Sequence, residues 1–370
     1  MIRLLQEFVE CESPSSDAEA VAHFVDLIAD RTSDIASAKV VRCKSSGPNV
    51  YGPHLRLEFK TNGRRKDGQI LGLGHSDTVW PLGTLKSMPF RRTRGRLWGP
   101  GVLDMKAGLA FFIYAVRALR EFDVPVPRRV VLLVVSDEEM GSETSRSLTE
   151  KEAAKSNAVL VVEPGTGLEG KLKTSRKGVG DYTVRVDGVA AHAGVDFANG
   201  ASAIVEMARQ IETISTFTDL KRGITVNPGI VRGGTRTNVV AGQAEVDVDI
   251  RVARLKDAMP LDRKFRALKP FDGRCRLTIS GGLNRPPMER SPAIRSLFEQ
   301  AQRAGTDLGL TIEESATGGG SDGNFTSALG IPTLDGVGGV GEGAHTPNES
   351  ILIDRMADRV ALLALMIQSL

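Results

Sequence analysis

Acidic and histidine side chains recur directly after apolar or glycine-rich segments of this sequence. The stretches that carry them read GLGHSDTV, GPGVLDMKAG, VVSDEEMGS, VVEPG and GEGAHTPNES. Their chemically active side chains are His75, Asp77, Asp104, Glu138, Glu139, Glu163 and His345. Imidazoles and carboxylates of this kind can bind divalent metal ions or transfer protons, so the set indicates a metal centre or an acid–base site.

Carboxylates that gather at one point repel one another and lose hydration, and a bound cation supplies the compensating charge. The set offers imidazole and carboxylate ligands without a thiolate, which suits zinc, with cobalt or manganese as alternatives. Three carboxylates and two histidines would give five ligands. Five ligands exceed the needs of one tetrahedral ion but suit two ions that share a bridging carboxylate. We therefore predict two divalent metal ions, with zinc expected.

Spacing within the motifs separates ligands from supporting residues. Side chains at i and i+2 of a strand point the same way, so Asp77 can orient His75 without binding metal itself. The adjacent Glu138 and Glu139 point differently, so one can bind metal while the other faces the substrate as a general base.

Strand and helix signals alternate in the first half of the chain. QILGLGH, RRVVLLVV and SNAVLVV are continuous apolar runs typical of strands buried on both faces of a parallel sheet, and a helical pattern covers residues 17–30. The pattern predicts an α/β fold with a mostly parallel central sheet flanked by helices. In such sheets, sites form at the carboxyl ends of the strands, where the acidic motifs lie.

Near residue 177 the pattern changes to alternating apolar and polar residues, as in KGVGDYTVRVDG and GQAEVDVDIRVA. Such strands have one solvated face, which predicts an antiparallel α+β insertion with a helix at 200–215. The first pattern then returns with helices near 291–306 and 322–329, a strand at 308–315, a strand in IPTLDGV and a terminal helix. We expect a catalytic domain in two parts, 1–176 and 287–370, interrupted by a lid at 177–286.

Composition excludes several classes of protein. The 370 residues carry 48 Lys and Arg against 45 Asp and Glu, a net charge of +3 that predicts neither a nucleic-acid nor a membrane partner. The three cysteines are far apart, so a disulfide framework and a thiolate zinc site are not expected. The N-terminal segment lacks a signal-peptide core, which predicts a cytoplasmic protein unless a leader has been removed.

The motifs GHSDTVWPLGT, GPGVLDMKAG, SDEEMGS, VVEPG, AHAG, TGGGSDGNF and GAHTPNES, in this order, resemble those of the co-catalytic zinc peptidases. This family includes glutamate carboxypeptidase, acetylornithine deacetylase, succinyl-diaminopimelate desuccinylase and aminoacylase, and the likeness is greatest to bacterial glutamate carboxypeptidase. The resemblance implies that His75, Asp104 and Glu163 bind one ion and that Asp104, Glu139 and His345 bind the other. It also implies Glu138 as the base, Asp77 as the residue that orients His75, and a cis peptide bond after Asp104.

The same resemblance assigns roles in the insertion, which corresponds to the family's lid and dimerisation domain. His192 in AAHAG matches a histidine that stabilises the oxyanion, in its own or in a partner subunit. Arg251 matches a clamp for a substrate carboxylate, Asn238 matches a substrate-contacting asparagine, and Gly318–Gly320 resemble a backbone cradle that includes Gly319 and Gly320. A homodimer formed through the lid is implied.

The expected function is hydrolysis of an amide bond next to a free carboxylate, in a small peptide. An N-acyl amino acid deacylase or deacetylase is the alternative within the family. Outside the family, Gly319–Gly323 fits G-x-S-x-G, so a serine hydrolase that uses Ser321, Asp335 and His345 is a rival. A binding module without catalysis is a further rival, although it would not need Glu138. The G-x-G-x-x-G match GVGGVG does not run directly into a helix, so we reject a dinucleotide site.

Overall fold

The computed structural model describes residues 1–43, 50–63 and 66–370. The chain forms two compact units. The first comprises 1–175, 290–316 and 321–370, and the second comprises 176–289 and 317–320. The expected lid at 177–286 therefore falls within the second unit, which also takes in the glycine-rich segment 317–320.

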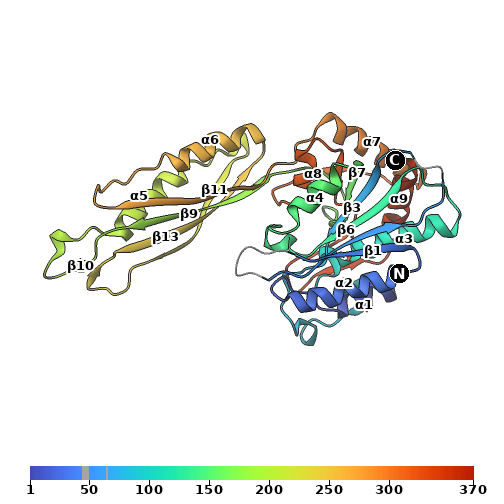
Figure 1. The fold of residues 1–370 in the computed structure, drawn as a ribbon, viewed down its shortest axis with the longest axis horizontal. Helices are drawn as coiled ribbons and strands as arrows, with labels where there is room; N and C mark the ends of the chain where they lie inside the picture. The colour runs from blue at the N-terminus through green and yellow to red at the C-terminus, as the bar shows by residue number, and fades with distance from the viewer. Residues whose placement is uncertain (44–49, 64–65) are drawn as a thin grey trace. The chain divides into compact units, whose positions relative to one another are not determined.

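An eight-stranded sheet forms the centre of the first unit, in the order β1-β2-β6-β3-β7-β16-β8-β15 (Figure 1). Its strands are β1 (Ala36–Val41), β2 (His54–Phe59), β3 (Gln69–His75), β6 (Arg129–Val135), β7 (Ser156–Val161), β8 (Leu172–Arg176), β15 (Glu314–Thr317) and β16 (Thr333–Asp335). The central strands β6, β3, β7 and β16 run parallel, whereas β1 and β2 pair antiparallel at one edge. The predicted mostly parallel sheet is confirmed.

Helices cover both faces of this sheet, as predicted. They are α1 (Ile2–Glu10), α2 (Ala18–Thr32), α3 (Ala107–Glu121), α4 (Arg146–Ala153), α7 (Pro292–Asp307), α8 (Gly323–Ala328) and α9 (Met356–Ser369). Because strand side chains alternate, Leu132 and Val134 face the large core under α1, α2, α3, α7 and α9, while Val131 and Leu133 face a smaller core under α4. This burial on both faces explains the continuous apolar runs.

Shorter elements complete the first unit. A four-stranded sheet has the order β17-β18-β5-β4, and η2 and η3 are short helical turns. The bounds are β4 (Arg91–Thr93), β5 (Arg96–Trp98), β17 (Gly341–Glu342), β18 (Ser350–Leu352), η2 (Val102–Lys106) and η3 (Glu138–Met140).

The second unit is an antiparallel sheet of order β11-β13-β9-β14, with two helices and a small β10–β12 pair. Its elements are β9 (Gly178–Asp187), β10 (Ala191–His192), α5 (Ala203–Ser215), β11 (Thr225–Gly233), β12 (Val239–Val240), β13 (Gln243–Val252), α6 (Leu255–Arg266) and β14 (Arg276–Arg285). On β13 the residues Val246, Val248 and Ile250 are buried in the helix-covered core, whereas the residues between them are half-buried. This is the one-sided burial that the alternation predicted.

The predicted strand at 308–315 is wrong over most of its length. Residue Leu308 ends α7, and Gly309 adopts a left-handed φ of 71° while Leu310 N–H donates back to Gly305. Ile312 then packs against α7. The alternating apolar residues therefore belong to a helix-ending turn that packs on its own helix, and β15 begins only at Glu314.

Over the part of the chain that the structure describes, no helix is both long enough and apolar enough to cross a membrane. This agrees with the absence of a long uncharged apolar run in the sequence.

Candidate active site

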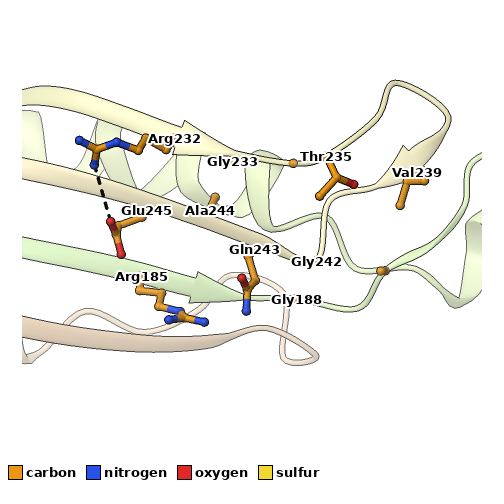
Figure 2. Close-up of a pocket in the computed structure, with 12 residues that line it drawn as sticks. Arg185, Gly188, Arg232, Gly233, Thr235, Val239, Gly242, Gln243, Ala244 and Glu245 are labelled. Carbon is orange, nitrogen blue, oxygen red and sulfur yellow. Dashed lines mark ion pairs between the residues drawn. The ribbon is translucent and has the colours of Figure 1, made fainter.

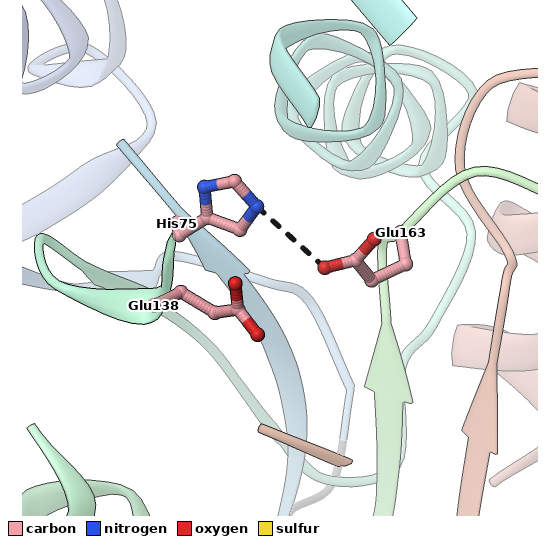
Figure 3. Close-up of side chains that lie close together, drawn as sticks. All are labelled: His75, Glu138 and Glu163. Carbon is pink, nitrogen blue, oxygen red and sulfur yellow. Dashed lines mark ion pairs between the residues drawn. The ribbon is translucent and has the colours of Figure 1, made fainter. Parts of the chain in front are cut away.

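His75 ends β3 between the parallel neighbours β6 and β7, and its side chain is almost completely buried. Its Nδ1 lies 2.8 Å from the carbonyl oxygen of Asp77. Its Nε2 lies 3.3 Å from Asp104 Oδ1 and 3.6 Å from Glu163 Oε1, and Figure 3 shows the ring directed at Glu163, just beyond β7. The carbonyl thus fixes the ring and leaves Nε2 to face the carboxylates.

Asp104 lies between the two histidines of the predicted metal centre. While Oδ1 faces His75, Oδ2 lies 3.3 Å from His345 Nε2, and that nitrogen is 3.2 Å from Glu139 Oε1. The Asp104–Met105 peptide bond is cis, as the resemblance implied. One carboxylate therefore presents a separate oxygen to each of two clusters, which is the arrangement of a bridging ligand.

Glu138 and Glu139 lie on η3, directly after β6. Oxygen atoms of Glu138 and Glu163 lie within 4.8 Å of each other and of a ring nitrogen of His75, and Glu139, Asp104 and His75 form a second such group. The structure therefore brings all the predicted metal ligands and the predicted base together at the carboxyl ends of β3, β6 and β7.

Asp77 makes contacts through two different groups, its backbone carbonyl and its carboxylate. Its carbonyl holds His75, whereas its carboxylate lies 3.5 Å from the His75 ring and accepts hydrogen bonds from the N–H groups of Glu138 and Glu139, at 3.3 and 3.2 Å. The Ser15 hydroxyl donates to the same carboxylate at 2.8 Å. Asp77 therefore positions the glutamate turn as well as the histidine.

The charges of the cluster compensate one another through the histidines. Burial by itself lowers the pKa of His75, but the carboxylates of Asp104 and Glu163 outweigh it and raise that pKa well above its usual value. The carboxylates of Asp104 and Glu139 raise the pKa of His345 to about 10. Burial raises the pKa of Asp77 to about 6. Burial also acts to raise the pKa of Asp104, but the neighbouring His345 and His75 outweigh it and lower that pKa.

The donor set fits divalent metal ions. Among the described residues, the buried atoms His75 Nε2 and Asp104 Oδ1 make no hydrogen bond, although each lies beside groups of opposite charge. Buried polar atoms without hydrogen bonds are costly, and metal coordination would satisfy both. Imidazole nitrogens and carboxylate oxygens are the ligands that zinc and similar ions take.

In the second unit, His192 and Asn238 come together. His192 on β10 pairs with Val239 on β12, and the carbonyl of Asn238 accepts from Ala193 N–H. The Nδ1 atom of the exposed His192 accepts hydrogen bonds from the N–H groups of Gly194 and Val195, both at 3.2 Å. The proton of the neutral ring is therefore on Nε2, which is left as a donor.

Arg251 and the glycine segment also lie together. Arg251 Nη1 is 3.4 Å from the carbonyl of Gly318, and the buried Arg176 donates to the carbonyls of Gly319 and Gly320. Arg251 already has a carboxylate partner, however: its Nε and Nη2 donate to Asp249 at 2.9 and 2.7 Å. The sequence did not reveal this pairing between the forked guanidinium and a carboxylate.

The structure contradicts the serine-hydrolase alternative. Ser321 is fully buried, and its hydroxyl donates directly to Asp335 Oδ2 at 2.6 Å. His345, the required base, lies instead beside Asp104 and Glu139. The GVGGVG segment is also explained, because the buried guanidinium of Arg359 donates to the carbonyls of two of its glycines.

A cavity of about 560 Å³ opens in the second unit beside β11, β13 and β9 (Figure 2). Its lining includes Arg185, Arg232 and Glu245, with an ion pair between Arg232 and Glu245. None of the predicted site residues lines it.

Comparison with known proteins identifies the family of this chain. Residues 72–369 match the family described as Peptidase family M20/M25/M40. The chain belongs to this family. A carboxypeptidase G2 of Pseudomonas sp. (strain RS-16) is 28% identical over 100% of this chain and 89% of its own length. A succinyl-diaminopimelate desuccinylase of Acidovorax ebreus (strain TPSY) is 29% identical over 89% of this chain and 88% of its own length.

Solved structures share the fold of this M20/M25/M40 peptidase-family member. Aminopeptidase PepT from Bacillus cereus superposes with a TM-score of 0.79 at 22% identity, covering 99% of this chain and 98% of that one. The YXEP protein of Bacillus subtilis, described as a dinuclear metal binding peptidase, has a TM-score of 0.68 at 14% identity, covering 100% of this chain and 97% of that one. These structures show the fold, while the family match over residues 72–369 confirms the predicted family and shows that the chain is an enzyme of the hydrolase class.

Sequence reasoning missed Glu349, which is fully buried and whose carboxylate accepts hydrogen bonds from the N–H groups of Gly101, Leu103 and Asp104. Its position four residues after His345, within the motif GAHTPNES, was the available signal.

Binding of divalent metal should release protons. Because the surrounding carboxylates raise the pKa of His345 to about 10 and also raise the pKa of His75, these rings hold protons that metal coordination must displace. Affinity should therefore rise with pH. Titration calorimetry in two buffers of different ionisation enthalpy measures the released protons, and His345→Asn should release fewer. Heats that do not depend on the buffer would contradict this account.

Proposed function

We propose that this chain is a two-metal exopeptidase that hydrolyses an amide bond next to a free carboxylate. The observation that carries the proposal is the placement of Asp104, whose two oxygens lie 3.3 Å from His75 and from His345, respectively. His75, Asp104 and Glu163 would hold one ion, and Asp104, Glu139 and His345 the other. We expect zinc, with cobalt or manganese as alternatives.

When bound, the two cations supply Lewis acidity, which acidifies water and polarises a carbonyl group. Glu138 takes a proton from the attacking water while the water oxygen bonds to the carbonyl carbon. The same carboxyl then delivers that proton to the leaving nitrogen as the carbon–nitrogen bond breaks. Support for this role comes from the position of Glu138, whose carboxylate belongs to the His75 and Glu163 group.

Residues of the second unit would bind the substrate. The Nε2–H of His192 would donate to the carbonyl oxygen as negative charge develops, and the tautomer set by Gly194 and Val195 supports this. Arg251, with Asn238 and the backbone of Gly318–Gly320, would hold the substrate carboxylate. The short distance between Arg251 and Gly318 supports a shared subsite.

The relatives favour two substrate classes. Likeness to carboxypeptidase G2 over the full chain favours a carboxypeptidase reaction. The motif resemblance to bacterial glutamate carboxypeptidase favours a peptide or acyl compound with a C-terminal glutamate. Likeness to succinyl-diaminopimelate desuccinylase favours an N-acyl amino acid as the second candidate. Both substrate classes carry an amide and a free carboxylate, so the same groups would serve either reaction.

The function is tested by measuring the metal content of the purified protein together with acyl-glutamate and N-acyl amino acid hydrolysis before and after chelation. We expect about two metal ions per chain, with activity that is lost to the chelator and restored by zinc. Activity that is insensitive to chelation would contradict the metal mechanism. Bound metal without turnover of any acyl amino acid or dipeptide would support the non-catalytic binding module.

Glu138→Gln should retain both metal ions but lose about 10²-fold or more of kcat, because the carboxamide cannot accept the proton of water. Steady-state kinetics and metal analysis of the same preparation check this. Glu150→Gln, on the exposed side of α4, is the matched control and should leave kcat unchanged. A Glu138→Gln variant with near-normal turnover would remove Glu138 from the role of base.

Arg251→Ala should raise KM for carboxylate substrates about 10- to 100-fold with a smaller effect on kcat, since a charge-assisted hydrogen bond to the substrate is lost. Arg232 is the matched control because it pairs with Asp247, on the same strand as Asp249, at 2.9 Å. Arg232→Ala should leave KM unchanged. An unaltered KM for Arg251→Ala would exclude the clamp.

We also expect a homodimer formed through the second unit. Strand β11 is an edge of its sheet, and its side chains Ile230 and Val231 are 51% and 61% exposed. Unpaired, apolar edges of this kind favour pairing with another chain. Light scattering should give twice the chain mass, and Ile230→Lys should shift the protein toward monomer. A monomeric wild-type protein would contradict the expectation.

A further inference from the structure

Glu349 is a fully buried carboxylate for which the proposed chemistry has no use. Its Oε1 accepts hydrogen bonds from the N–H groups of Leu103 and Asp104, at 2.9 and 3.0 Å. Its Oε2 accepts from Gly101 N–H at 2.9 Å and from Trp80 Nε1 at 2.8 Å. Four donors from two separate loops thus converge on one side chain.

Three of these donors belong to the turn that carries Asp104. That turn is irregular: Gly101 has a left-handed φ of 69°, and Asp104 and Met105 have non-helical φ angles of −115° and −133°. Backbone N–H groups in such a segment lack the regular acceptors of a helix, and buried N–H groups need partners. Glu349 supplies those partners, including one for the N–H of Asp104 itself.

Glu349 also belongs to the segment that carries His345. The intervening turn is closed by backbone hydrogen bonds from Thr346 N–H to Gly343 and from Glu349 N–H to Thr346, at 2.9 and 3.0 Å. His345 itself has a left-handed φ of 62°, which is uncommon for a residue with a side chain. The Glu349 carboxylate therefore connects the segment of one predicted ligand to the turn of another.

We propose that Glu349 is a positioning residue that sets the Asp104 turn relative to His345, so that the two oxygens of the Asp104 carboxylate face His75 and His345. This inference rests on the proposed function for the identity of the metal ligands. Glu349 is neither a proposed metal ligand nor a proposed substrate contact. It acts through the backbone of the bridging residue, and it should affect metal affinity and kcat more than KM.

Glu349→Gln is the decisive variant, because glutamine keeps the shape but replaces one acceptor oxygen with a donor amide. In either orientation its NH₂ group faces two N–H donors. We expect Co²⁺ affinity, measured by calorimetry on the metal-free full-length protein, to fall about 10- to 100-fold. We also expect kcat for acyl-glutamate to fall while KM stays within about threefold.

Glu206→Gln is the matched control. Glu206 is also buried and also accepts backbone N–H groups, from Phe271 and Asp272 at 3.0 Å, but in the second unit. It should lower thermal stability without changing Co²⁺ affinity. Parallel loss of Co²⁺ affinity in both variants would indicate a general folding effect and overturn the proposal.

A folded Glu349→Gln protein with wild-type Co²⁺ affinity would also overturn it. If that variant does not fold, Glu349→Asp decides, because it keeps the charge but withdraws the oxygens from the turn; unchanged Co²⁺ affinity then excludes positioning. Failure of the proposed reaction can be distinguished from failure of the positioning role. If the wild-type protein binds Co²⁺ more tightly than Glu349→Gln but hydrolyses no acyl-glutamate, the positioning role stands and only the proposed reaction is wrong.

Discussion

Crowded negative charge at the carboxyl ends of the central strands is the constraint on which the site depends. Asp104 lies between His75 and His345, with Glu139 and Glu163 as further neighbours. Such a group of carboxylates is stable only beside positive charge, which protonated imidazoles or metal ions supply. The pKa values of both histidines are raised because the neighbouring carboxylates stabilise their protonated forms. A parallel sheet meets the geometric side of the constraint, because adjacent strands end at the same edge.

Two buried carboxylates beside the cluster accept hydrogen bonds from backbone N–H groups. Asp77 accepts hydrogen bonds from the N–H groups of Glu138 and Glu139, and Glu349 accepts them from the turn of Asp104. Both carboxylates act on turns rather than on regular helices or strands. Turns have unpaired N–H groups, and a charged acceptor binds such groups more strongly than a neutral one. These hydrogen bonds fix the turns that carry Glu138, Glu139 and Asp104.

Membership of Peptidase family M20/M25/M40 and the arrangement of the cluster both indicate a hydrolase. The first unit holds the cluster of imidazoles and carboxylates. The second unit holds a histidine with a defined tautomer and an arginine beside a glycine segment. In the proposed clamp, a substrate carboxylate would share the guanidinium of Arg251 with the resident carboxylate of Asp249.

Motif chemistry and hydrophobic periodicity were sufficient to predict the α/β fold and the membership of the cluster around Asp104, since these depend on residue type and on where apolar runs end. Local patterns could not assign the apolar residues of 308–313, which pack on the preceding helix instead of forming a strand. They also could not find Glu349, which is 245 residues from Asp104 in sequence, or the carboxylate partner of Arg251, which depends on side-chain direction. The sequence by itself determined which groups could do chemistry. Only the tertiary structure decided which acceptor each turn received, because that depends on where distant segments meet.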